Sequence, residues 1–211
     1  MTKMLPLSSA VRTKRGRKYD DVIAGARSVF LRDGFDGANV DQIAREAGVS
    51  KATLYSYFDD KRLLFMEVAR LECAQLAEQA EREIDVCQPP EVVLPFAGRT
   101  ILGFICSPLG LGVFRLCVAE AERFPELGRL YYTSGPKTAH VSLTTYLEAC
   151  VARGQLDIKD LELASNQFCE LCRSDVQTKM LFGIDAAPDE AEVTRIVDSA
   201  VAMFLARYKT R

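Results

Sequence analysis

The chain has 211 residues, 48% of them hydrophobic, which is enough for a packed core in one or two domains. Its apolar runs are far shorter than the roughly 18 residues that span a bilayer, and the N-terminus has no signal-peptide core, so we expect a cytoplasmic protein with no membrane contact. The net charge of −2 is uneven. Residues 1–70 hold 13 Lys and Arg against 9 Asp and Glu, and the rest hold 14 against 20. A basic head favours contact with a polyanion there.

The seven cysteines are odd in number and scattered, which argues against a disulfide framework. Cys169 and Cys172 form a CxxC pair. A zinc site needs about four ligands, and the sequence offers no second CxxC and a single histidine, His140. We therefore expect buried thiols, no metal and no cofactor, with redox sensing as the alternative for the CxxC pair.

Residues 1–17 form a polar segment that contains Pro6, and the basic run RTKRGRK covers positions 12–18. We expect a flexible arm. Such an arm could follow phosphates or enter a minor groove, or it could be a solvated tail that aids solubility. The cations concerned are Arg12, Lys14, Arg15, Arg17 and Lys18.

Helical spacing of apolar residues begins at Val22 and ends near Gly34, before a loop "FDGANV". Asn39 and Gln42 then have the spacing of a capping box, which predicts the start of a short helix that stops at Gly48. Ser50 is expected to cap the next helix, "KATLYSYF". A long helix is expected from about residue 60 to 87.

Pro89 and Pro90 interrupt that helix. Further helices are expected over 91–106, 109–123, 126–153 with a break near Gly135-Pro136, 159–182 and 188–208. No stretch shows the alternation typical of strands. We predict an all-α protein with three parts: a flexible basic arm (1–17), a helix-turn-helix domain (18–62) and a larger helical domain (63–211).

The two short helices around Gly48 have the layout of a helix-turn-helix. Ile43 and Leu54 would hold the helices together, Ala44 would allow a close crossing, and Val49 would fill the turn. Ordinary helix packing is the alternative. The outer face of the second helix favours the first interpretation, because it holds short or flat groups that can approach a groove and donate hydrogen bonds. These are Lys51, Ala52, Thr53, Tyr55, Ser56 and Tyr57.

Residues 22–68, "VIAGARSVFLRDGFDGANVDQIAREAGVSKATLYSYFDDKRLLFMEV", resemble the DNA-binding domain of the TetR/AcrR family of transcriptional repressors. The resemblance implies double-stranded operator DNA as a partner, with Lys51, Ala52 and Tyr55 nearest the base edges. It also implies phosphate contacts by Ser50, Thr53, Tyr57 and Lys61, and it points the helix that starts at Asn39 and Val40 towards the backbone. Ala52 stands where the family often has Gly, and Ser56 where it often has a larger polar residue.

The rest of the chain shows no catalytic set: no phosphate-binding loop, no dinucleotide turn and no nucleophile near His140. We expect no enzyme activity. Residues 114–153, which include "AEAERFPELGRLYYTSGP", resemble the C-terminal domain of AefR-like members of the family. That resemblance implies a pocket for a small effector, while ordinary core packing is the alternative for each residue. Candidate lining residues are Phe96, Phe104, Phe114, Cys117, Glu120, Phe124, Tyr131, Tyr132, His140 and Tyr146.

The last two helices carry long apolar stripes, and a last helix this apolar needs packing partners on more than one side. In the family these helices pair with their copies in a second subunit; the alternative is that they cover the core of one chain. The resemblance thus implies a homodimer. Candidate interface residues are Phe168, Leu171, Cys172, Val193, Ile196, Val197, Ala200, Val201 and Phe204.

Together these features predict a repressor that binds a palindromic operator as a dimer and is released by a small hydrophobic or aromatic effector. Two alternatives remain at this stage: an activator, or a ligand-binding or interaction protein whose head has no regulatory contact with DNA.

Overall fold

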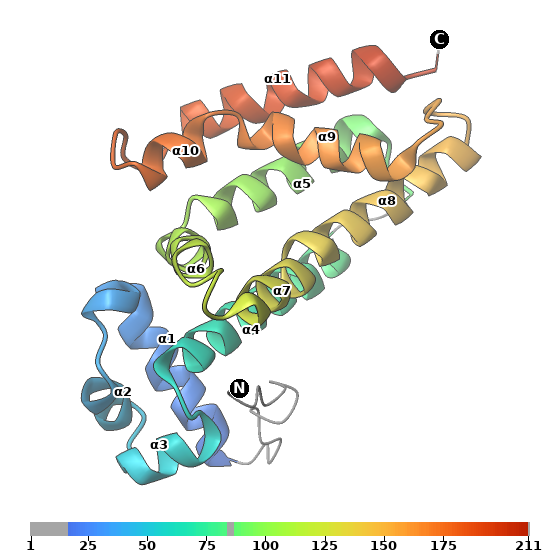
Figure 1. The fold of residues 1–211 in the computed structure, drawn as a ribbon. Helices are drawn as coiled ribbons and strands as arrows, with labels where there is room; N and C mark the ends of the chain where they lie inside the picture. Colours follow the sequence, from blue (N-terminus) through green and yellow to red (C-terminus); the bar gives the residue numbers. More distant parts are fainter. Residues whose placement is uncertain (1–16, 84–86, 211) are drawn as a thin grey trace. The chain divides into compact units, whose positions relative to one another are not determined.

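A computed structural model describes residues 17–83 and 87–210, and the chain divides into two compact units (Figure 1). Unit 1 combines the residues up to Glu72 with Gly112–Tyr131, and unit 2 combines Cys73–Leu111 with Tyr132–Arg211. Helices α4 and α6 each contribute residues to both units. The fold across the described residues is all-α, as predicted from the sequence.

Unit 1 begins with α1 (Arg17–Gly37), α2 (Val40–Glu46), α3 (Lys51–Tyr57) and the first part of α4 (Lys61–Glu83). The second half of α6 (Pro108–Ala119) and most of α7 (Pro125–Ser134) complete it. Its core is rich in aromatic side chains. Phe30 and Phe65 meet edge to face with ring centroids 4.7 Å apart, and both are buried.

Unit 2 contains α5 (Pro90–Ile105), α8 (Pro136–Ala152), α9 (Leu161–Arg173), α10 (Val176–Leu181) and α11 (Glu190–Tyr208). Helix α9 packs against α5, α8 and α11 (Figure 1). Gly98 lets α5 approach closely, because a Cβ atom there would lie 2.9 Å from Val197 and 3.1 Å from the sulfur of Cys172. Lys209 pairs with Glu91 at 2.5 Å and ties the end of α11 to the start of α5.

Most predicted helices are present, and the differences have local causes. Gly34 breaks α1 with φ 70°, as expected, but helical turns resume through Gly37, so part of the predicted loop is helical. The predicted 159–182 helix is two helices, α9 and α10, because Ser174 leaves helical geometry with φ 46°. Arg17 begins α1, while the arm before it and the predicted end of α4 at residues 84–86 lie outside the described residues.

Among the described residues, 17–83 and 87–210, no single helix has the length and apolar character to cross a bilayer, although α5 and α6 together, bent at their junction, meet that criterion by length and composition.

Candidate nucleic-acid interface

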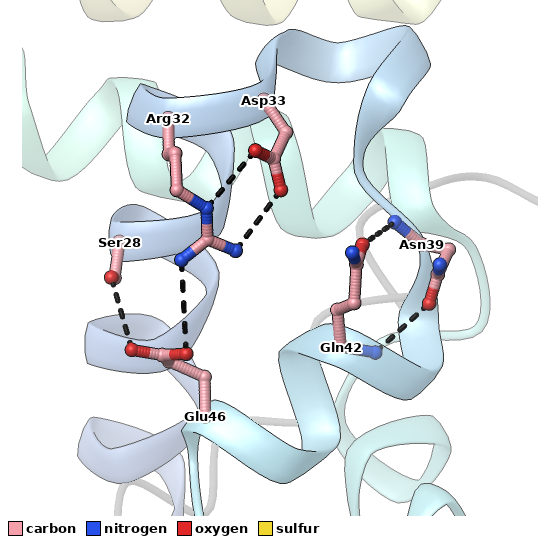
Figure 2. A network of polar contacts seen from close by, with 6 residues as sticks. All are labelled: Ser28, Arg32, Asp33, Asn39, Gln42 and Glu46. Carbon is pink, nitrogen blue, oxygen red and sulfur yellow. Dashed lines mark hydrogen bonds and ion pairs between the residues drawn. The ribbon is translucent and has the colours of Figure 1, made fainter.

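Helix α2 begins with the capping box that the sequence predicts (Figure 2). The side chain of Asn39 accepts a hydrogen bond from the backbone N–H of Gln42 at 2.9 Å, and the side chain of Gln42 accepts one from the N–H of Asn39 at 3.3 Å. These bonds satisfy donors that a seven-residue helix cannot satisfy internally. They also engage the amide of Asn39, a residue expected at the DNA backbone.

Polar contacts hold α2 against α1 on the other side of the same view (Figure 2). Glu46 accepts a hydrogen bond from the hydroxyl of Ser28 at 3.3 Å and lies 4.0 Å from the guanidinium of Arg32. Gly25 of α1 lies so close to α2 that a Cβ atom would sit 2.6 Å from the backbone nitrogen of Ala47. The first helix of the pair is therefore fixed by direct backbone contact.

The turn between α2 and α3 has the geometry that a helix-turn-helix needs. Gly48 has φ 62°, a region that favours glycine. The N–H of Val49 donates to the carbonyl of Ala44 at 3.0 Å, and Ser50 then caps α3 by accepting a hydrogen bond from the N–H of Thr53 at 3.1 Å. The turn at Gly48 and the cap at Ser50 were predicted from residue type, whereas the bond between Val49 and Ala44 was not.

Helix α3 turns Leu54 inward, as predicted, and is followed by the buried Phe58. We define the recognition surface as Lys51, Ala52, Thr53, Tyr55, Ser56 and Tyr57, all of which are exposed or half-buried. Its two aliphatic hydroxyls are already oriented: Ser56 donates to the carbonyl of Thr53 at 2.6 Å, and Thr53 shares a hydrogen bond of 2.9 Å with Ser50. Tyr55 remains 45% exposed. The result is a low, polar face on an ordered helix.

A buried polar contact lies behind this surface. Tyr19 of α1 donates a hydrogen bond of 2.6 Å to Glu67 of α4, and Arg70 donates two of 2.7 Å to the same carboxylate. The ring of Tyr19 meets that of Tyr57 edge to face at 5.8 Å and lies 5.8 Å from Phe58. This arrangement links α4 to the last turn of α3, and it was not predictable from the sequence because Tyr19 and Glu67 are 48 residues apart.

Two charged groups near the surface are engaged in ways that the sequence did not indicate. The ammonium of Lys61 donates to the carbonyls of Phe35 and Ala38 at 2.7 and 2.9 Å, so it holds the α1–α2 connection rather than standing free for a phosphate. Lys51, predicted at the base edges, pairs with Asp41 of α2 at 2.5 Å. Asp41 was not among the predicted site residues. The feature that could have identified it is its position in the first turn of α2, where a carboxylate lies at the end of the helix that was expected to face DNA.

Five of the ten predicted effector-lining residues belong to unit 1, and each of them already has a polar or aromatic partner there. Glu120 accepts a hydrogen bond of 2.9 Å from Arg62, which also binds Asp60 and stacks on Phe124 with 3.9 Å to the ring centroid. Glu120 is therefore neutralised by a cation of the same unit. The five residues are Phe114, Cys117, Glu120, Phe124 and Tyr131.

The other five belong to unit 2 and differ widely in exposure. Tyr132 is 55% exposed, whereas Tyr146 is buried and donates a hydrogen bond of 2.9 Å to the carbonyl of Gln88. His140 lies 3.4 Å from the hydroxyl of Ser165, and burial lowers its pKa. These contacts give the Tyr146 hydroxyl and the Nδ1 atom of His140 partners within the chain. The five residues are Phe96, Phe104, Tyr132, His140 and Tyr146.

The predicted dimer residues differ in burial, and the interface itself stays a prediction. Leu171 and Val193 are partly exposed, but the other seven are buried within the chain and belong to the apolar cluster of unit 2. A side chain already covered by its own core has no surface left for a second copy, so contact would have to use outward positions of α9 and α11. The seven are Phe168, Cys172, Ile196, Val197, Ala200, Val201 and Phe204.

The CxxC cysteines are buried, as expected. Burial raises the pKa of Cys169 to about 11 and that of Cys172 to about 12. Both thiols therefore stay protonated at neutral pH, which disfavours thiolate chemistry. In the part of the chain that the structure describes, no three His, Cys, Asp or Glu side chains gather as a metal site would require.

Two family descriptions match the chain. "Bacterial regulatory proteins, tetR family" matches residues 22–68, and "AefR-like transcriptional repressor, C-terminal domain" matches residues 92–210. Among curated proteins, the transcriptional repressor AcnR of Corynebacterium diphtheriae is 32% identical over 66 residues, which are 31% of this chain and 35% of AcnR. The chain thus matches about a third of the length of such relatives.

Solved structures match over nearly the whole chain. A TetR-family regulator from Mesorhizobium loti is 28% identical with a TM-score of 0.79, covering 94% of this chain and all of that one. The flavonoid-responsive regulator FrrA is 33% identical with a TM-score of 0.66, covering 93% of this chain and 99% of its own. The protein therefore belongs to the TetR family of DNA-binding transcriptional regulators, which are not enzymes, and its C-terminal domain is of the AefR-like type.

Proposed function

We propose that the protein is a repressor that binds a roughly palindromic operator as a homodimer and leaves it when a small hydrophobic or aromatic effector binds. The observation that carries this proposal is the recognition surface: α3 is capped and packed on one side by Leu54 and Phe58, and it presents a low polar face on the other. Two such helices on a two-fold axis would lie about one turn of DNA apart.

The recognition surface supports distinct roles for its residues. Lys51, Ala52 and Tyr55 are proposed at base edges, where an ammonium, a methyl and a phenol can each contact a different base. Hydroxyls fixed by hydrogen bonds are suited to phosphate oxygens, because little side-chain freedom is lost on binding. We assign this role to Ser50 and Thr53, and we propose a phosphate contact for the hydroxyl of Tyr57 as well, whose ring packs on Tyr19. Asn39 and Val40 would face the backbone, and the basic arm would follow neighbouring phosphates.

The proposed effector follows from the composition of the predicted lining residues and from one relative. Seven of the ten are aromatic residues of the Phe or Tyr type, and apolar ligands with a ring fit such walls. FrrA, which is similar over nearly its whole length, responds to flavonoids. We therefore propose a flat polyphenol as the first class to test. Such a ligand can release DNA only if it binds the DNA-free conformation more tightly than the DNA-bound conformation, and the ratio of the two affinities limits the effect.

The proposed homodimer would use the outward faces of α9 and α11. Leu163 and Met203 are 50% and 58% exposed there, and Leu171 and Val193 are partly exposed beside the core of unit 2. Exposed apolar side chains on adjacent helices favour helical pairing with a second copy.

The test is a gel shift of the full chain on duplex DNA taken from upstream of its own gene, with and without the flavonoid quercetin. A discrete retarded band that quercetin abolishes would support both parts of the proposal. Retardation that is equal on shuffled DNA would overturn the operator, and a specific band that survives quercetin and other flat polyphenols would overturn the proposed effector class. Sedimentation of the free protein checks the dimer.

A further inference from the structure

An exposed ion pair joins the two helices of the helix-turn-helix. Nζ of Lys51, the first residue of α3, lies 2.5 Å from Oδ1 of Asp41 in the first turn of α2. The two side chains keep 53% and 62% of their surface exposed. Pairs this open to water contribute little to folding stability, so stability is a poor explanation for the pair.

The place of Lys51 in its helix is also unfavourable for a cation. The N-terminus of a helix carries partial positive charge, which favours a carboxylate and disfavours an ammonium. Lys51 is the one charged residue in the α3 sequence KATLYSY, and it stands at that N-terminus. Its charge is offset by the carboxylate of Asp41, and both groups remain open to a partner outside the protein.

Asp41 makes an ordinary phosphate contact an incomplete account. A carboxylate only accepts hydrogen bonds, and a phosphate is likewise an anionic acceptor, so Asp41 repels the DNA backbone. The major groove differs, because a base edge can donate. Asp accepts from the N4 amino group of cytosine, and Lys donates to O6 and N7 of guanine.

The order of groups in the groove distinguishes the two kinds of base pair. A G·C pair presents two adjacent acceptors on guanine and then the amino donor of cytosine. An A·T pair instead places its amino donor between two acceptors, N7 of adenine and O4 of thymine. An ammonium beside a carboxylate complements the G·C pair, because the ammonium faces the guanine acceptors and the carboxylate faces the cytosine donor. At an A·T pair the donor has an acceptor on each side, and these acceptors would repel the carboxylate.

We propose that Lys51 and Asp41 together read a G·C pair in the major groove, and that Asp41 is a specificity-determining residue that disfavours other sequences. This inference rests on the proposed function, in which α3 enters the major groove. In the free protein each group holds the other in place. On the matching base pair each gains a partner, and on other DNA the carboxylate is left against acceptors.

The test is selection of binding sites from a random double-stranded library by the full chain and by Asp41→Asn. The expected wild-type motif contains one G·C pair in each half-site whose preference falls about tenfold in Asp41→Asn. This variant should also bind random duplex more tightly at low salt, because a repulsive charge is gone. Asp36→Asn, which removes an exposed carboxylate of α1, is the matched control and should keep the preference.

The outcomes separate the inference from the proposed function. A wild-type motif that Asp41→Asn leaves unchanged overturns the inference and leaves DNA binding intact. If the wild type enriches no sequence, the proposed function fails first and the inference falls with it. Circular dichroism checks that the variant folds. Lys51→Gln is a second variant that must weaken the preference at the same pair, and an unchanged motif there also contradicts the inference.

Discussion

The helix-turn-helix of unit 1 is shaped by polar contacts between near neighbours in sequence, whereas unit 2 is joined by apolar side chains from distant helices. Asn39 and Ser50 each bond a backbone N–H three residues on. In unit 2 the large cluster draws on α5, α8, α9 and α11, and its buried polar side chains among the described residues are Ser165 and Gln177. Directional bonds fix a surface for contact with DNA, and an apolar cluster fixes a core.

This contrast explains what the sequence could predict. The caps at Asn39 and Ser50 and the positive φ of Gly48 were predictable because each depends on residue type within a few positions. The Asp41–Lys51 pair and the carbonyl contacts of Lys61 were not, because they depend on the distance between separate segments.

The same reason explains why the sequence was ambiguous in unit 2. An apolar residue such as Phe168 or Val197 satisfies helical spacing equally well in a core, in a pocket wall or in a dimer interface. Only the packing of α9 and α11 on α5 shows that both are buried in the chain itself. For the predicted effector pocket, residue type gave candidates such as Glu120, whose pairing with Arg62 no local pattern indicated.

The largest expected effect separates core from surface on α9. Phe168→Ala should lower the free energy of unfolding by about 3–5 kcal/mol, because the ring is fully buried against Phe204. Chemical denaturation measures this loss, which should not depend on protein concentration. Leu163→Ala, on the exposed side of the same helix, should leave monomer stability nearly unchanged and weaken dimerisation in sedimentation experiments. If Phe168→Ala instead weakened dimerisation and left monomer stability unchanged, Phe168 would lie in the interface.

A smaller effect is expected where α1 touches α2. Gly25→Ala should destabilise unit 1 by about 2 kcal/mol, because the new methyl would lie 2.6–2.8 Å from atoms of Ala47, including its backbone. DNA binding should weaken as the two helices separate. Gly37→Ala is the control, since its methyl would meet Asp33 at an ordinary 3.5 Å. Equal thermal stability of the two variants would show that the close approach is unimportant.

The cap of α3 should contribute less. Ser50→Ala is expected to cost about 1 kcal/mol, because the N–H of Thr53 loses its side-chain acceptor. The matched change Ser56→Ala should cost almost nothing, since that hydroxyl donates to a carbonyl within its own helix. Urea denaturation of the two variants checks the difference, and a Ser56→Ala loss as large as that of Ser50→Ala would contradict it.

The smallest effect concerns pH in unit 2. Burial lowers the pKa of His140 below its usual 6.5, so the unfolded chain binds the proton first. The free energy of unfolding should therefore fall as pH drops through about 6.5, with Glu170 opposing this trend and Arg173 adding to it. His140→Gln should flatten the dependence between pH 7.5 and 5.5 in denaturation experiments. Because the chain has one histidine, identical slopes for both proteins would exclude this cause.

The central claim is that the recognition surface lies against duplex DNA and distinguishes its sequence. The direct test is the ratio of dissociation constants for promoter duplexes from around its own gene and for shuffled duplexes, measured by fluorescence anisotropy at about 150 mM salt. We predict a ratio on the order of a thousand or more for at least one duplex, reduced in Tyr55→Ala, whose exposed ring can be removed without disturbing the core. A ratio near one for every promoter duplex would contradict the account.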